Sequence, residues 1–185
     1  MTLTSKRLRL EALSVCHVAD VVAYRLRNRA YLEPWEPSHA SHYFTEEYVA
    51  TAIERLMSET HATRFALFER DGEHMIGFFD ISEIRRGIVQ AATIGYSVDE
   101  AHTARGYATE GVGVLTAYAF DVLGLHRLEA SYFPENEASG RALVKNGFRV
   151  EAYARELLFI GNRWRDAILV AKTNHAFRWN NPVAL

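Results

Sequence analysis

The chain has 185 residues, 49% of them hydrophobic and 12% aromatic, which predicts one compact domain with a core of its own. The formal net charge of −2 argues against a basic face for direct nucleic-acid binding. Cys16 is the only cysteine, which excludes an intramolecular disulfide, and no run approaches the ~20 apolar residues of a membrane span, so we expect a cytoplasmic protein without membrane attachment.

A strand and a helix are predicted first. Residues 7–13 alternate polar and apolar side chains, as in a half-buried strand. Ser14 then caps a helix whose apolar residues recur at helical spacing: Val15, Val18, Val22 and Leu26. Cys16 is expected to be a buried, inert thiol at the start of that helix.

A loop and a second helix follow. Residues 28–44 contain Pro34 and Pro37 around Trp35, which predicts a loop that exposes the tryptophan and lines a binding site. Thr45, followed by two glutamates, begins a helix that runs to about Glu59. His39 and His42 have a spacing found in metal sites, but no further ligands complete a set, so no metal is expected.

Three strands are predicted next, over residues 64–70, 74–83 and 89–99, joined by turns at Asp71-Gly72 and Arg86-Gly87. Because the turns are short, we expect an antiparallel meander.

The second half alternates helices and strands. The predicted elements are a helix ending at Gly124, a strand over residues 126–133, a helix over 136–146, a strand over 148–159 and a last strand ending at Lys172. The order βααβββαβαββ predicts an α/β fold with a mixed sheet and helices on both faces. Residues 1–173 form the single domain, and residues 174–185 are a tail without readable periodicity.

The segment from residue 101 to residue 111, AHTARGYATEG, predicts an anion-binding turn that opens a helix. Helix starts carry unpaired N–H groups, and Gly106 lets the backbone approach a bound anion closely. Arg105 adds a charge, and Thr103 and Thr109 add hydroxyl groups. By spacing alone, the turn suits a nucleotide, a phosphate or a coenzyme.

Several motifs resemble the GNAT superfamily of N-acetyltransferases. The segment Arg105-Gly106-Tyr107-Ala108 resembles the Gly-x-Ala part of the family's coenzyme A motif, although Thr103 stands where the family has Gln or Arg. Residues 136–148, NEASGRALVKNGF, are similar to the family's Asn-x-x-Ser helix ending in Lys-x-Gly-Phe. Four further segments look like the RimJ/RimL-type subfamily, which acetylates ribosomal-protein N-termini: residues 31–37, 95–97, 132–134 and 161–166.

The resemblance implies a fold in which two central parallel strands splay apart and hold the pantetheine of acetyl-CoA between them. The backbone at Tyr96, Ser97 and Val98 would then hold the thioester and polarise its carbonyl group. The residues implied for the rest of the coenzyme are Thr103, Ala104, Arg105, Gly106, Tyr107, Ala108, Thr109 and Asn136.

For catalysis, the resemblance places Ser139 where a serine is proposed to protonate the departing sulfur. A structural interpretation makes Asn136 the N-cap of the helix and Ser139 its N3 partner, and it is compatible with the catalytic one. Leu143 stands where many members have a catalytic tyrosine, which excludes that acid. Glu156, on the face of Leu158 by the period of two, is a candidate base, with a solvated strand carboxylate as the alternative.

For the acceptor, Trp35 and Glu36 are expected to recognise an amine. An α-amine with a pKa near 8 costs about 1.4 kcal/mol to deprotonate at pH 7, against about 4.6 kcal/mol for lysine, which favours a protein N-terminus, ribosomal in the first instance. A small-molecule amine, or acyl-CoA binding without turnover in a sensor module, are the alternatives. A monomer or a homodimer is expected.

Overall fold

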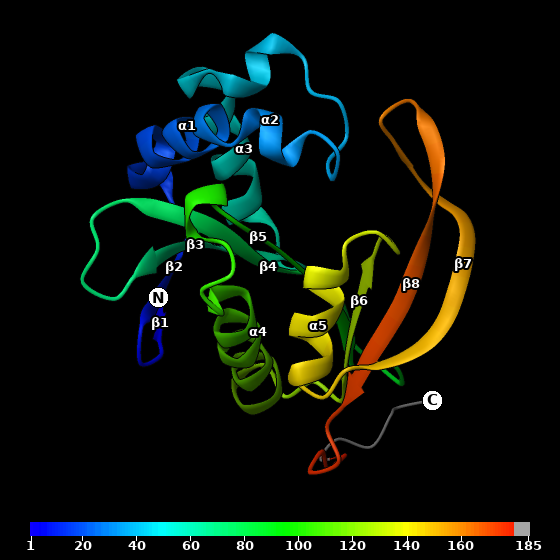
Figure 1. Ribbon diagram of the computed structural model, residues 1–185. Helices are drawn as coiled ribbons and strands as arrows, with labels where there is room; N and C mark the ends of the chain where they lie inside the picture. Colours follow the sequence, from blue (N-terminus) through cyan, green and yellow to red (C-terminus); the bar gives the residue numbers. More distant parts are fainter. Residues whose placement is uncertain (180–185) are drawn as a thin grey trace.

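The computed structural model describes residues 1–179, which form an eight-stranded sheet of order β1-β2-β3-β4-β5-β6-β8-β7 (Figure 1). The strands are β1 (Thr2–Thr4), β2 (Leu8–Ala12), β3 (Thr63–Glu69), β4 (Met75–Arg85), β5 (Ala91–Val98), β6 (Arg127–Tyr132), β7 (Arg149–Ile160) and β8 (Arg163–Thr173). The helices are α1 (Val18–Arg27), α2 (Arg29–Leu32), α3 (Glu46–Ser58), α4 (Tyr107–Ala117) and α5 (Glu137–Lys145). The predicted α/β class with a mixed sheet is confirmed.

The meander over β3, β4 and β5 is antiparallel as predicted, and Thr45 caps α3 by accepting a hydrogen bond from the backbone of Tyr48. Two features were not predicted. Residues 2–4 pair with Arg9–Glu11 to add β1, a strand too short to show periodicity. Residues 28–44, expected to be a loop, contain α2 and a 3₁₀ turn at Ser41–Phe44.

The two faces of the sheet carry separate cores. On β3, Phe65 and Leu67 pack into the core beneath α4 and α5, whereas Ala66 and Phe68 pack into the core beneath α1 and α3. This follows from the alternation of side chains along a strand. Helices therefore cover both faces, as expected.

The predicted burial of the first helix's apolar face is wrong for the residues at its two ends. Val15 is 51% exposed and Leu26 54% exposed, while Val21 and Tyr24 are buried. A 3₁₀ turn at Val15–His17 precedes α1, so the 3.6-residue period does not run through from Val15. For the same reason Cys16, expected to be buried, is exposed.

The centre of the sheet is split, as the family resemblance implied. Strands β5 and β6 run parallel and pair at three positions, Ala91 with Arg127, Ala92 with Leu128 and Thr93 with Glu129. Beyond Thr93 this register ends, in the part of the chain that the structure describes. Helices α4 and α5 lie side by side over this region (Figure 1).

Helix α4 is held against β4 at a position that only glycine fits. A Cβ on Gly111 would lie 2.2 Å from the ring of Phe79, which is fully buried. The missing side chain lets α4 sit close enough to the sheet to place its first turn beside β5.

We expect Gly111→Ala to destabilise the protein by about 1–3 kcal/mol, since overpacking against Phe79 outweighs the gain of about 1 kcal/mol in helix propensity. Gly113→Ala is the matched control, because its Cβ would meet only the Asn146 Oδ1 atom at 3.1 Å. Urea unfolding measures both. Equal stability of the two variants would contradict the close approach at Gly111.

Candidate active site

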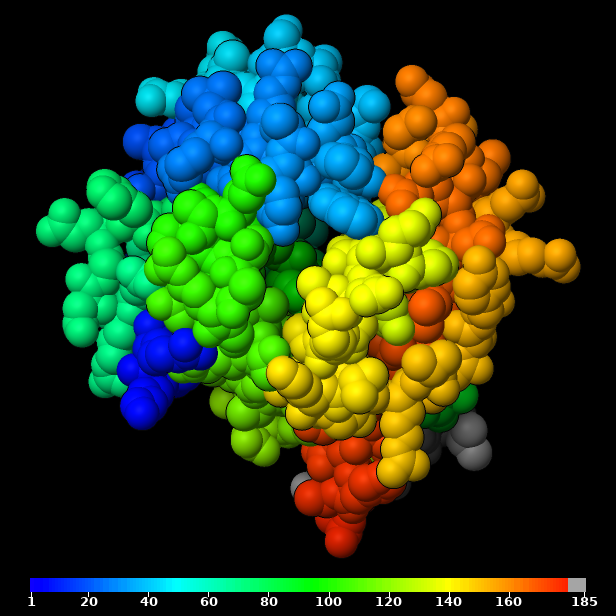
Figure 2. Space-filling model, viewed as in Figure 1, coloured from blue at the N-terminus to red at the C-terminus, as the bar shows by residue number. Residues whose placement is uncertain are grey.

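A cavity of about 820 Å³ lies where β5 and β6 part. Figure 2 shows it as a hollow between the blue segment around α2, the green turn before α4 and the yellow helix α5. Its lining includes residues 94–98 of β5, residues 130–133 of β6 and its extension, and the first turns of α4 and α5. The volume suits a ligand of coenzyme size.

At one end of the cavity, the first turn of α4 exposes backbone amides. Gly106 is the N-cap of α4 with φ of +79°, a left-handed conformation that glycine adopts without strain. The first bond of the helix runs from Glu110 N to Gly106 O at 3.0 Å, so Tyr107, Ala108 and Thr109 present amides that have no acceptor inside the helix. These amides and the helix dipole favour a phosphate.

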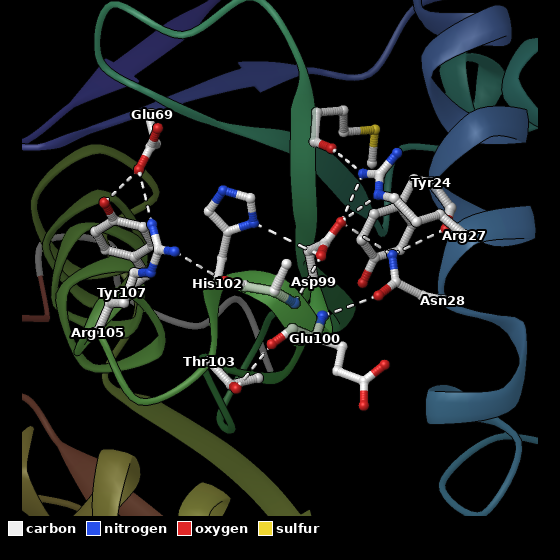
Figure 3. Close-up of polar contacts among 12 residues, drawn as sticks. Tyr24, Arg27, Asn28, Glu69, Asp99, Glu100, His102, Thr103, Arg105 and Tyr107 are labelled. Atoms are coloured by element: carbon white, nitrogen blue, oxygen red, sulfur yellow. Dashed lines mark hydrogen bonds and ion pairs between the residues drawn. The ribbon is translucent and has the colours of Figure 1, made fainter.

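The predicted turn residues do not all face this end. Thr103, Ala104, Gly106, Tyr107, Ala108 and Thr109 line the cavity, but the Arg105 guanidinium does not. It donates to Ala101 O at 3.0 Å and lies 3.9 Å from Glu69 (Figure 3), because that carboxylate stands beside it on β3. The Thr103 hydroxyl donates to Glu100 O at 2.8 Å.

A buried carboxylate, Asp99, fixes the turn to helix α1 (Figure 3). It is 1% exposed and accepts hydrogen bonds from Arg27 Nε at 2.6 Å, Asn28 Nδ2 at 3.2 Å and Ala101 N at 2.9 Å. Asn28 also accepts from Glu100 N at 2.9 Å. Burial raises the pKa of Asp99, but these donors together hold it below its usual value.

The middle of the cavity follows β5. Since β5 is hydrogen-bonded to β4 on one side, alternate backbone groups of residues 94–98 point towards the gap. The Ser97 hydroxyl turns to the other face, where it accepts from Tyr24 Oη at 2.9 Å. Because Asp99 N donates to Ile76 O of β4 at 2.8 Å, alternation leaves the backbone groups of Tyr96 and Val98, and not those of Ser97, on the side of the gap. A role for residues 96–98 in holding a thioester stays a prediction.

Ser139 and Tyr96 meet across the gap. Asn136 caps α5 by accepting from Ser139 N at 3.2 Å, so the N-cap interpretation is confirmed. The Ser139 side chain does not complete a reciprocal cap; its Oγ lies 2.9 Å from Tyr96 Oη. Burial raises the pKa of Tyr96 to about 12, so this phenol keeps its proton at neutral pH.

Trp35 and Glu36 lie over the cavity. Trp35, expected to be exposed, is half-buried because it stacks on Phe133 with ring centroids 6.2 Å apart. Arg165 holds the segment in place by donating to Pro34 O at 2.6 Å, with its guanidinium 3.8 Å from the Phe133 ring. Glu36 is half-buried and lines the cavity.

Glu156 is not brought to the cavity. A bulge between Ala154 and Leu158 breaks the period of two on β7, so Leu158 lines the cavity while Glu156 is exposed, with its amide bonded to Asp166 Oδ1 at 2.8 Å. The geometry gives it no contact with the gap.

Residues that sequence reasoning missed complete the lining. Arg141 and Lys145 lie one turn apart on α5 and line the cavity, where Arg141 pairs with Glu137 at 3.0 Å, and His102 lines it near the start of α4. Their i, i+4 spacing could have signalled a basic stripe on α5. Within residues 1–179, no group of three or more metal-ligating side chains occurs, and no helix is long and apolar enough to cross a membrane.

Comparison with known proteins assigns the fold and its chemistry. Residues 7–149 match the family described as "Acetyltransferase (GNAT) domain". The chain is 34% identical over 175 residues to the [Ribosomal protein uS5]-alanine N-acetyltransferase of Escherichia coli, covering 90% of each chain.

Two solved structures are similar throughout. The ribosomal-protein-S5-alanine acetyltransferase from Vibrio fischeri has a TM-score of 0.91 and 28% identity, over 97% of this chain and 100% of that one. Mycobacterium smegmatis RimJ in complex with CoA-disulfide has a TM-score of 0.85 and 30% identity, over 90% of this chain and 81% of that one.

We expect Asp99→Asn to lower the free energy of unfolding by about 1–3 kcal/mol at pH 7, because it removes the charge of a buried acceptor whose ion-pair partner, Arg27, is half-exposed. A carboxylate whose folded pKa is lowered stabilises the fold above its unfolded pKa of about 4, and this stabilisation is lost as pH falls through the folded pKa. The difference from the parent protein should hold from pH 7 to 5 and shrink below about pH 4. Glu100→Gln, an exposed neighbour, is the control; a pH-independent difference for Asp99→Asn would contradict the role of its charge.

Proposed function

Because the chain belongs to the GNAT acetyltransferase family, we propose that it transfers the acetyl group of acetyl-CoA to the N-terminal α-amine of a protein, ribosomal in the first instance. The amine would attack the thioester directly. The family match over residues 7–149 and the relatives that act on ribosomal protein uS5 and S5 support this assignment.

One observation carries the proposal. A single cavity joins the free amides at the start of α4 to the gap between β5 and β6. Coenzyme A has the matching order of groups: a diphosphate, then a chain with two amides, then the thioester. The diphosphate would lie at Gly106 and Tyr107, and the amides would pair with the open edge of β5.

The reaction follows from the groups at the gap. The backbone N–H groups of Tyr96 and Val98 would bind the carbonyl oxygen and stabilise its charge as the amine attacks. The C–S bond then breaks, and the Ser139 hydroxyl would supply a proton to the sulfur. Tyr96 Oη, 2.9 Å from Ser139 Oγ, would orient that hydroxyl.

On the acceptor side, the carboxylate of Glu36 would attract the ammonium form of the N-terminus. The Trp35 ring packs against Phe133, so it would form a wall of the acceptor's path and would not bind the acceptor itself.

The experiment is thiol release from acetyl-CoA with a panel of acceptors: peptides that begin with alanine or serine, N-terminally blocked lysine peptides, and small amines. We expect turnover with free N-termini. Turnover of small amines alone would favour the small-molecule alternative. Coenzyme binding without turnover of any acceptor would contradict the enzyme and favour a sensor module.

The diphosphate position is tested at Gly106. We expect Gly106→Glu to weaken coenzyme A binding by about 100-fold relative to Gly106→Ala, since charges about 5 Å apart at an effective dielectric constant near 20 repel by about 3 kcal/mol. Both variants carry the same backbone strain, so the comparison isolates the charge. Equal dissociation constants in calorimetry would remove the diphosphate from this turn.

The proton donor is tested at Ser139. We expect Ser139→Ala to lower kcat by about 100-fold, while the dissociation constant of coenzyme A changes little. Tyr96→Phe keeps the serine hydroxyl and should lower kcat by less. An unchanged kcat for Ser139→Ala would leave the residue a role in the first turn of α5 only.

A further inference from the structure

A second cavity, of about 570 Å³, lies on the opposite face of the sheet beneath α1, α2 and α3. It shares four lining residues with the first cavity: Leu32, Glu36, Tyr96 and Ser97. The two cavities therefore meet at the end of β5, where the proposed thioester would lie. A group that enters from the second cavity reaches this point without crossing the coenzyme.

Asp80 lines the second cavity and lies against the wall between the two. It stands on β4 directly opposite Gly95 of β5, and a Cβ on Gly95 would lie 3.0–3.3 Å from its carboxylate group. Gly95 itself lines the first cavity. At this point, only the backbone of β5 separates the carboxylate from the proposed coenzyme channel.

Within residues 1–179, the Asp80 carboxylate has few polar contacts. Its side chain is 22% exposed, and its charged contact is Arg64 Nη2 at 3.7 Å, longer than a hydrogen bond. Burial raises the pKa of Asp80, and the guanidinium of Arg64 partly offsets this. A desolvated carboxylate in a cavity, without a strong donor, favours a cation or a proton from a ligand.

Three arginines line the cavity with Asp80: Arg64 is its ion-pair partner, and each of the three also contacts an aromatic ring. Arg25 donates to Tyr43 O at 2.8 Å and lies 3.7 Å from the Tyr43 ring, Arg29 lies over the Phe44 ring, and Arg64 lies over the Phe78 ring. The other charged or titratable groups on the lining are the carboxylates of Glu33 and Glu36, the imidazole of His39, and the phenols of Tyr24, Tyr43, Tyr48 and Tyr96.

We propose that Asp80 is the base that receives a proton from the acceptor's ammonium group in the second cavity. This rests on the proposed function. One proton passes from the ammonium to Asp80, and the neutral amine attacks the carbonyl carbon to form the C–N bond. As the C–S bond breaks, the Ser139 hydroxyl gives its proton to the thiolate, and the second N–H proton of the former amine replaces it. The products are the amide, the free thiol and one proton, which Asp80 returns to solvent.

The test compares Asp80→Asn with the parent protein from about pH 5.5 to about pH 9, with acetyl-CoA and a peptide that begins with alanine as substrates. We expect kcat/KM at neutral pH to fall by about 10²–10⁴-fold and the acidic limb of its pH profile to disappear. The dissociation constant of coenzyme A should stay within about twofold, since Asp80 does not line the first cavity.

Two further variants leave Asp80 in place. Arg64→Gln removes the charge that lowers the pKa of Asp80, so the acidic limb should move to higher pH. Glu36→Gln should raise KM for the peptide and leave the acidic limb unmoved, because Glu36 attracts the ammonium without taking its proton.

Two results overturn the inference. In the first, Asp80→Asn keeps the kcat/KM of the parent protein and the acidic limb of its pH profile. In the second, Asp80→Asn keeps the acidic limb and Glu36→Gln loses it. Failure of the proposed function looks different: the parent protein itself would not turn over the peptide. If another amine of the panel is acetylated, the ratio of variant to parent is measured with that amine. If none is, both proposals fall.

Discussion

The parting of β5 and β6 is the constraint on which the rest of the structure depends. Two parallel strands that stop pairing in the middle of a sheet leave backbone groups without partners, and burying such groups is costly. The gap stays open because α4 and α5 cover one face and the segment around Trp35 covers its end. A ligand that carries its own amide groups, as pantetheine does, would supply the missing partners.

The buried network around Asp99 ties the end of β5 and the turn before α4 to helix α1. Asp99 follows β5 directly and accepts from Arg27 and Asn28 at the end of α1, while Ala101, two residues on, begins the approach to α4. The proposed phosphate site on one face therefore takes its position from a helix on the other face. Shielding from water strengthens these charged hydrogen bonds, which makes the turn stiff before any ligand arrives.

The sequence predicted what depends on neighbours along the chain. Alternation revealed the strands, Thr45 marked the start of α3, and Gly106 marked the turn before α4. Features that depend on the register between paired strands could not be foreseen: the bulge that removes Glu156 from the gap and the pairing that places Asp80 opposite Gly95. The 3₁₀ turn that exposes Cys16 is local, but its residues also fit the spacing of a helix, so the sequence did not distinguish the two. Distances between strands are set by the whole sheet and leave no local pattern.

The sheet separates the two cores, and this separation affects which substitutions the protein tolerates independently. Side chains beneath α1 and α3 touch a different set of residues from those beneath α4 and α5, since β3 sends alternate residues to each. Substitutions in one layer are thus largely additive with those in the other. A change beneath α1 and α3, the layer that would meet the acceptor, could therefore leave the layer beneath α4 and α5, which would hold the donor, as it is.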